Sequence, residues 1–154
     1  MDHPFLASEP FATVNAELAE ILHFGATPVG DRRVIHINGG RVSGARVNGI
    51  ILPGGADWQV VRADGAADIQ ARYTIEADGG GHILAESKGL RHGPAEVIDA
   101  LARGKDVDPA RYFFRVLYRF ETGIEDLDWL NRTMALGVGR RRPRGVEIDL
   151  YEIL

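Results

Sequence analysis

Cysteine is absent from this chain of 154 residues, and lysine is scarce, because only Lys88 and Lys105 occur among its 18 basic residues. The lack of thiols excludes disulfides, thiolate metal sites and cysteine nucleophiles. Arginine supplies all the other basic side chains. We attribute this bias to genome composition, so it carries no functional prediction.

Long apolar runs are also missing. No segment approaches the length that crosses a membrane, and residues 1–4 lack the basic region and apolar run of a signal peptide. We therefore expect no membrane partner and a cytoplasmic location. The formal net charge of −4 offers no basic excess to neutralise phosphates, so we expect no nucleic-acid partner either.

Glycine, by contrast, is concentrated in one region, with six glycines between residues 39 and 55. They match neither a Walker loop nor a dinucleotide fingerprint, and we expect the protein to use no cofactor. Because strand-like segments surround them, they indicate places where strands bend or backbones approach closely. The run ends in Pro53–Trp58, which brings Asp57 and Trp58 to a sharp turn.

Apolar and polar residues alternate with a period of two over most of the chain, which is typical of half-buried β-strands. The clearest case is the last one, where Val146, Ile148 and Leu150 share one face. The expected strands cover residues 12–24, 33–38, 46–52, 58–62, 69–76, 82–89, 113–122, 133–139 and 145–153. A loop is expected over residues 25–31, which include a proline and two glycines.

Only one segment repeats at helical spacing. Pro94 stands at its start, and Val97, Ile98 and Leu101 recur at helical intervals, which predicts one short α-helix over residues 94–103. Many strands with one helix predict a mainly β fold, either a barrel or a sandwich. The glycines favour a single antiparallel β-barrel of about eight to ten strands, lipocalin-like or related, over residues 1–154.

Several blocks along the chain carry a resemblance to a known family. They are Gly39-Gly40, Gly44, Gly49, Pro53–Trp58, Arg72-Tyr73, Gly89–Pro94, Tyr112–Arg115, Phe120–Gly123 and Trp129–Arg132. Together they resemble the family called domain of unknown function 3237, an uncharacterised protein family. The resemblance implies a compact β-barrel and a homodimer, and it implies little chemistry.

Asp57 is the first candidate for catalysis. It follows two glycines and precedes Trp58, which would form the wall of a pocket at the barrel mouth. A carboxylate against apolar surface has a raised pKa and can serve as a general acid or base. The alternative is a structural aspartate that caps a turn through nearby backbone N–H groups.

Glu121 is the second candidate. It ends a strand on which Arg115 and Glu121 share one face, while Phe120 lies on the other face with further aromatic residues. If the aromatic face forms the core, the charged face lies in solvent, and this arrangement is the one we favour. If polar groups instead line the interior, Glu121 would transfer a proton and Arg115 would recognise a carboxylate.

Other polar and aromatic residues are candidates for binding a small molecule. His92 precedes the expected helix and could act near neutral pH, and Arg91 beside it could clamp an anion. Tyr73, Phe120 and Trp129 would add aromatic walls. Asn131 would add an amide donor for a developing oxyanion. The structural alternative is that Trp129 packs a short helix onto the barrel and Asn131 caps a turn.

The one basic run, Arg140–Arg144, stands where two strands must be joined, and we expect it to form a solvated hairpin turn. A phosphorylated or nucleic-acid partner is the weaker alternative there. No pair of histidines has the spacing of a known metal motif, so we expect no metal site.

Two functions fit these residues. The first is a cofactor-independent enzyme of the isomerase, lyase or cyclase type, which acts by acid–base chemistry on a small aromatic or unsaturated carbonyl compound. It follows from the lack of cofactor fingerprints, thiols and a serine hydrolase elbow. The alternative is a barrel that binds a small apolar ligand without transforming it.

Overall fold

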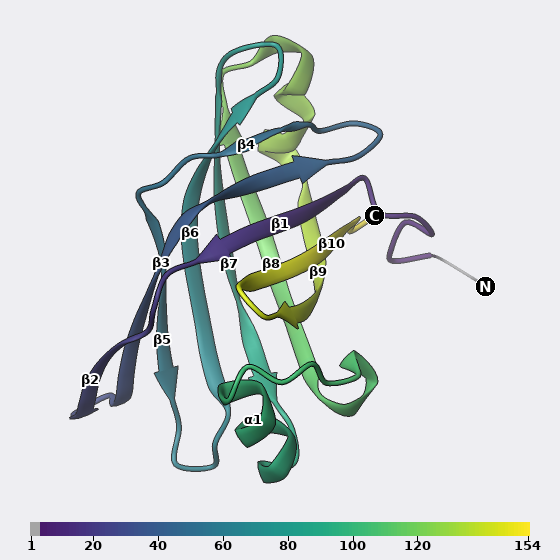
Figure 1. Cartoon of the computed structure of the whole chain (residues 1–154). Coiled ribbons are helices and arrows are strands. Elements are labelled where there is room, and N and C mark those ends of the chain that lie inside the picture. Colours follow the sequence, from purple (N-terminus) through teal and green to yellow (C-terminus); the bar gives the residue numbers. More distant parts are fainter. Residues whose placement is uncertain (1–3) are drawn as a thin grey trace.

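Ten β-strands form one antiparallel sheet in the computed structural model, which describes residues 4–154 (Figure 1). The strands are β1 (Ala12–Leu18), β2 (Leu22–Thr27), β3 (Gly30–Ser43), β4 (Gly49–Ile51), β5 (Gly55–Val61), β6 (Ala67–Ala77), β7 (His82–His92), β8 (Phe113–Thr122), β9 (Met134–Arg142) and β10 (Gly145–Glu152). The helices are α1 (Ala95–Ala102) and two 3₁₀ segments, η1 (Pro109–Arg111) and η2 (Glu125–Arg132).

The sheet closes on itself because β1 pairs with both β10 and β3. The ring runs β1-β10-β9-β8-β7-β6-β4-β3, so eight strands form the barrel. Two strands are additional: β5 joins β3 to β6 beside β4, and β2 pairs only with β3. The predicted mainly β fold with an antiparallel barrel is therefore confirmed.

Successive side chains along a strand point to opposite faces of the sheet, so every second side chain points into the barrel. On β8, Phe114, Val116 and Tyr118 are buried, whereas Leu117 and Arg119 are exposed. The aromatic face of this strand is thus the core face, which is the arrangement that the sequence favoured.

Each end of the barrel is covered by a helical segment (Figure 1). Helix α1 buries Val97 and Leu101 against one end. At the other end, η2 buries Leu130, and the Trp129 ring packs edge-on against Phe11 at 5.4 Å between centroids. None of the helices in residues 4–154 is both long enough and apolar enough to span a membrane.

Two of the predicted boundaries near the N-terminus are wrong. Residues 12–24 do not form one strand, because β1 ends at Leu18 and β2 then leaves the ring to pair with β3. The expected loop over residues 25–31 is a tight hairpin instead. Strand β3 also continues through Gly39 and Gly40, at φ +154° and +136°, where β1 passes so closely that a Cβ on Gly40 would lie 2.0 Å from the Asn15 carbonyl oxygen. The predicted helix over residues 94–103 agrees with α1 within a residue at each end.

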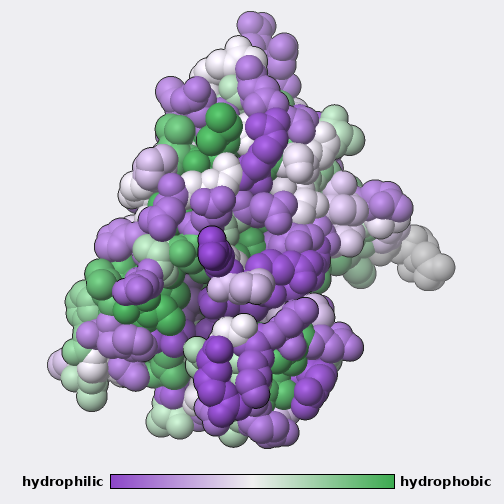
Figure 2. All heavy atoms as spheres, in the orientation of Figure 1, coloured by the Kyte–Doolittle hydropathy of each residue, from purple (hydrophilic) through white to green (hydrophobic). Residues whose placement is uncertain are grey.

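Exposed hydrophobic side chains gather on the outside of β2 and β5. Leu22, Phe24 and Trp58 are 49%, 62% and 42% exposed, and Leu22, Val34 and Trp58 lie in one row across β2, β3 and β5. Figure 2 shows hydrophobic residues at the lower left, where Figure 1 places β2. Trp58 therefore belongs to the outer surface of the barrel.

Candidate functional site

Polar side chains from four strands converge inside the barrel at the end that α1 covers. They are Arg33 from β3, Asp57 and Gln59 from β5, Arg91 from β7 and Arg141 from β9. We call this group the interior polar cluster. It combines one carboxyl group, one amide and three guanidinium groups in a largely apolar interior.

Glycine gives β5 its position in the barrel wall. Gly54 has φ +115°, which an L side chain rarely adopts, and a Cβ on Gly55 would lie 2.5 Å from the Arg72 carbonyl oxygen. The chain can therefore step sharply from β4 to β5 while it stays in contact with β6. From there the strand alternation turns Asp57 inward and Trp58 outward.

Asp57 is fixed by two hydrogen bonds that draw its carboxylate away from solvent. The β5–β6 pairing is interrupted between Asp57↔Ala71 and Val60↔Asp68. In this gap the Gln70 backbone N–H donates to Asp57 Oδ1 at 3.0 Å, and Gln59 Nε2 donates to Oδ2 at 2.6 Å. The carboxylate therefore takes a backbone donor that would otherwise lack a partner.

Burial raises the pKa of the Asp57 carboxyl above its ordinary value. The hydrogen bonds from Gln59 and Gln70, and the charges of Arg91 and Arg33, oppose this shift without cancelling it. A carboxyl group with a raised pKa can accept and return a proton closer to neutral pH than an exposed aspartate can.

The three arginines of the cluster have few protein partners. Arg33 Nη2 donates to Gln59 Oε1, but its Nε is buried without a partner. Within residues 4–154, no side-chain hydrogen bond or ion pair reaches the guanidinium of Arg91, which is 8% exposed, or that of Arg141. Burial, reinforced by Arg141 and Arg33, lowers the pKa of Arg91 to about 10. Burial and Arg33 also lower the pKa of Arg141.

Two enclosed spaces meet at these arginines. The inner one, of about 40 Å³, reaches Asp57 and lies within the barrel, and the other, of about 90 Å³, lies at the mouth beneath α1. Arg91 and Arg141 line both spaces. The inner space is bounded mainly by apolar side chains, among them Val14, Ile69, Phe114, Val116 and Ile148. The volumes suffice for a few water molecules, so side chains that line the two spaces must move to admit a larger ligand.

Two tyrosines border the inner space. The hydroxyls of Tyr73 and Tyr118 are hydrogen-bonded at 2.9 Å, and both rings are buried. Burial raises the pKa of Tyr118 to about 12 and that of Tyr73 well above its ordinary value. Both hydroxyls therefore stay protonated at neutral pH.

Of the candidates from the sequence, Asp57, Tyr73 and Arg91 line the inner space. Glu121 and Arg115 project from the outer face of β8, and His92 is exposed and stacks on Phe113 at 4.9 Å. The structure therefore does not bring the two predicted catalytic carboxylates together. The pocket wall expected at Trp58 is likewise absent, because that ring faces outward.

The remaining candidates lie at the η2 end of the barrel. Phe120 stacks on Tyr118 at 5.7 Å, and Trp129 is covered by Arg46 at 3.7 Å from its ring centroid. Asn131 accepts from the Thr122 backbone N–H and donates to the Thr122 carbonyl. Trp129 and Asn131 thus have the packing and capping contacts that formed their structural alternative.

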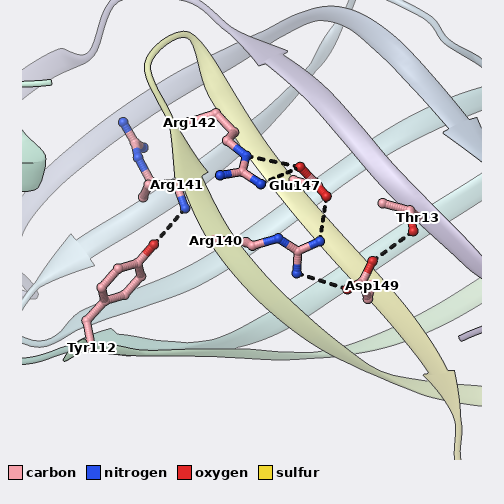
Figure 3. A network of polar contacts seen from close by, with 7 residues as sticks. All are labelled: Thr13, Tyr112, Arg140, Arg141, Arg142, Glu147 and Asp149. Carbon is pink, nitrogen blue, oxygen red and sulfur yellow. Dashed lines mark hydrogen bonds and ion pairs between the residues drawn. The ribbon is translucent and has the colours of Figure 1, made fainter. Parts of the chain in front are cut away.

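The sequence reasoning missed most of the cluster. Arg141 was expected in a solvated hairpin turn, but β9 continues to Arg142 and alternation turns Arg141 inward (Figure 3). Its neighbours Arg140 and Arg142 lie on the outer face and bind Glu147. The pattern Ala135, Gly137, Gly139, Arg141 was the available signal, since these positions share one face of a strand. No three His, Asp or Glu side chains within residues 4–154 are placed to hold a metal ion.

Comparisons with known proteins extend over nearly the whole chain. The family model described as Protein of unknown function (DUF3237) matches residues 6–153. A UPF0311 protein of Bradyrhizobium diazoefficiens is 38% identical over 98% of this chain and 99% of its own length. The crystal structure of a beta-barrel like protein from Acinetobacter baumannii is 41% identical, with a TM-score of 0.84 over 99% of each chain. An enzyme from Penicillium herquei shares the fold at 18% identity, with a TM-score of 0.73 over 100% of this chain and 98% of that one.

Proposed function

We propose a function for this chain, which belongs to the family of proteins of unknown function DUF3237, from the site that its own residues build. It is a cofactor-independent enzyme that moves a proton within a small aromatic or unsaturated carbonyl compound. The observation that carries the proposal is Asp57, a carboxyl group with a raised pKa at the inner cavity of the barrel.

The chemistry requires one base and one stabiliser of negative charge. The Asp57 carboxylate removes a proton from the carbon next to the substrate carbonyl, and the C–H electron pair becomes the double bond of an enolate. The guanidinium of Arg91 stabilises the charge on the enolate oxygen. In an unsaturated substrate the enolate is conjugated with the neighbouring C=C bond, so the protonated Asp57 returns its proton to the far (γ) carbon as the C=C bond shifts toward the carbonyl. Atoms and charge then balance, and the carboxylate is restored.

The surroundings of Asp57 support this role. Gln59 and the Gln70 backbone N–H hold the carboxylate in one orientation, as a base must be held. The apolar lining excludes bulk water, which strengthens the electrostatic effect of Arg91 on an oxyanion. The Penicillium herquei enzyme adds only that a barrel of this shape houses an enzyme in that case.

The alternative is a barrel that binds a small molecule without converting it. The excess of guanidinium groups over carboxyl groups in the cluster favours it, because holding an anion needs no proton transfer. The two functions share the cavity and differ in whether Asp57 exchanges a proton with the ligand.

Phenylpyruvate is a suitable probe because it combines an aromatic ring, a carbonyl group and acidic C3 protons. We expect the protein to accelerate the loss of these protons into D₂O, followed by ¹H NMR, and Asp57→Asn to lower the enzymatic rate at least about 100-fold. Glu121→Gln, which alters the outer carboxylate, should leave the rate within about twofold. Exchange that persists in Asp57→Asn would overturn the proposal, and binding without any exchange would favour the alternative.

A further inference from the structure

The interior polar cluster carries more positive charge than the protein itself neutralises. From this we infer that the substrate is a small apolar carboxylate, whose anionic group is bound by Arg91 and Arg141 at the end of the barrel that α1 covers. The inference rests on the proposed function, because it names the substrate class of the same cavity.

The charged side chains around the proposed carboxylate site come from several strands and can be counted. Arg33, Arg91 and Arg141 are cationic at neutral pH, since arginine stays protonated even where burial lowers its pKa. Within residues 4–154, Asp57 is the one carboxyl group that lines the inner space, and the exposed Asp31 carboxylate lies close enough to Arg33 to affect its pKa. Even with Asp57 fully ionised, two of the three interior cations lack a counterion within the cluster.

Such an arrangement is costly for the free protein. A buried cation loses its hydration, and the loss is offset only by an ion pair or by hydrogen bonds. Arg91 is nine-tenths buried and points into the cavity, yet no protein acceptor in residues 4–154 contacts its guanidinium. A carboxylate there would accept two parallel N–H donors from one guanidinium, which is the geometry that arginine favours.

Several arginines on the outside of the barrel wall have acidic partners. Arg62 binds Asp68 through two nitrogens at 2.7 and 2.6 Å, and Arg140 binds both Glu147 and Asp149. Other outer arginines, such as Arg119, have no acidic partner in residues 4–154, but their guanidiniums are exposed to water. The lack of a partner therefore costs free energy at Arg91, which is buried.

The rest of the cavity indicates what accompanies the carboxylate. The inner space is narrow and bounded mainly by aliphatic and aromatic side chains, with the Tyr73–Tyr118 pair among them. An apolar body next to the anionic group would match this lining. A phosphate monoester is larger and carries more charge, so it fits this narrow space less well, and the experiment includes it as a separate arm.

Calorimetric binding of three matched probes tests the inference. Phenylacetate carries the carboxylate, phenylacetamide is its neutral counterpart, and benzylphosphonate replaces the carboxylate by a larger anion. We expect saturable phenylacetate binding in the millimolar range or tighter and at least about tenfold weaker binding of the amide, as expected for charge-assisted hydrogen bonds. Benzylphosphonate should also bind more weakly than phenylacetate.

Variants then locate the anion. Arg91→Met and Arg141→Met should each weaken phenylacetate binding at least about tenfold and leave the amide unaffected. Arg119→Met, on the exposed outer face of β8, is the matched control and should bind like the wild type. Circular dichroism checks that each variant is folded, and having two interior variants guards against the failure of one. Equal affinity for acid and amide, preference for phosphonate, or binding that survives both interior substitutions would overturn the inference.

Failure of the inference can be told apart from failure of the proposed function. The methyl ester of phenylpyruvate keeps the reacting carbon and removes the negative charge. If exchange depends on Asp57 but is equally fast for acid and ester, and is unchanged in Arg141→Met, the proposed enzymatic function is retained and the carboxylate site is rejected. If phenylacetate binding depends on Arg91 and no probe exchanges its protons, the carboxylate site is retained and the proposed enzymatic function is rejected.

Discussion

Arg140 and Arg141 are neighbours in the chain and lie on opposite sides of the barrel wall (Figure 3). Arg140, on the outside, binds Glu147 and Asp149 across the β9–β10 hairpin. The side chain of Arg141, on the inside, has no hydrogen bond or ion pair within residues 4–154, and the Arg141 backbone N–H donates to the Tyr112 hydroxyl at 2.9 Å. One residue of strand alternation separates a partnered cation from one without a partner.

The difference separates what stabilises this fold from what it can do. The outer ion pairs join two neighbouring strands, with side chains about one-fifth exposed, and so contribute to the native state. The guanidiniums of Arg91 and Arg141 have no protein acceptor within residues 4–154, which lowers stability and prepares a site for an anion. We therefore expect stability and function to respond in opposite ways on the two faces.

The same substitution made one residue apart gives the largest contrast. Arg140→Met should lower the free energy of unfolding by about 1–2 kcal/mol, because Asp149 loses its arginine partner and Glu147 keeps only Arg142. Arg141→Met should leave stability unchanged or raise it, because a half-buried cation whose guanidinium has no partner in residues 4–154 is replaced by an apolar side chain. Urea unfolding at pH 7 measures both. If Arg141→Met lowered the free energy of unfolding more than Arg140→Met, Arg141 would have a stabilising partner, and the contrast between the inner and the outer arginine would be wrong.

Most of the fold follows from local pattern. The period of two and the single helical segment predict the strands and α1, because alternation and helical spacing are properties of short segments. The closure of the ring through β1 and the departure of β2 depend on pairings between distant segments, which no local pattern specifies. The β1–β2 boundary was therefore the weakest prediction.

The residues of the interior polar cluster were harder to predict from the sequence, for a related reason. Asp57 could be chosen because its glycines and aromatic neighbour are adjacent in the chain. Arg91 and Arg141 come from strands far apart, and a run of arginines at a hairpin usually marks solvent. Glu121 had a suitable side chain, but only the direction of the aromatic face of β8 decided that it lies outside.

The tyrosine pair tests whether the stability of polar groups inside the barrel depends on burial itself or on the presence of a hydrogen-bond partner. Tyr73 and Tyr118 lie inside the barrel like Arg141, but they are hydrogen-bonded to each other like the outer ion pairs. Tyr118→Phe should cost about 1 kcal/mol, because it leaves the buried Tyr73 hydroxyl without a partner. Tyr73→Phe should cost less, because Ser87 also lies close enough to Tyr118 to affect its pKa. Thermal and urea unfolding of both variants would test this order, and no cost in either would show that partnership is irrelevant inside the barrel.

The smallest effect we expect is a difference in sign between an inner and an outer carboxyl group as pH changes. Burial raises the native pKa of Asp57, so between about pH 4, where an unfolded aspartate titrates, and the native pKa the folded state binds more protons. The Asp57 contribution to stability is therefore lost as pH rises through that interval.

Hydrogen bonds from Arg140 and Arg142 lower the native pKa of Glu147. The Glu147 contribution to stability is therefore present above the unfolded pKa and is lost as pH falls through the native pKa. Urea unfolding from pH 3 to 8 should show that Asp57→Asn becomes more stable relative to the wild type toward neutral pH and that Glu147→Gln becomes less stable. Parallel pH profiles for the two variants would mean that the carboxylates inside and outside the wall have equivalent environments.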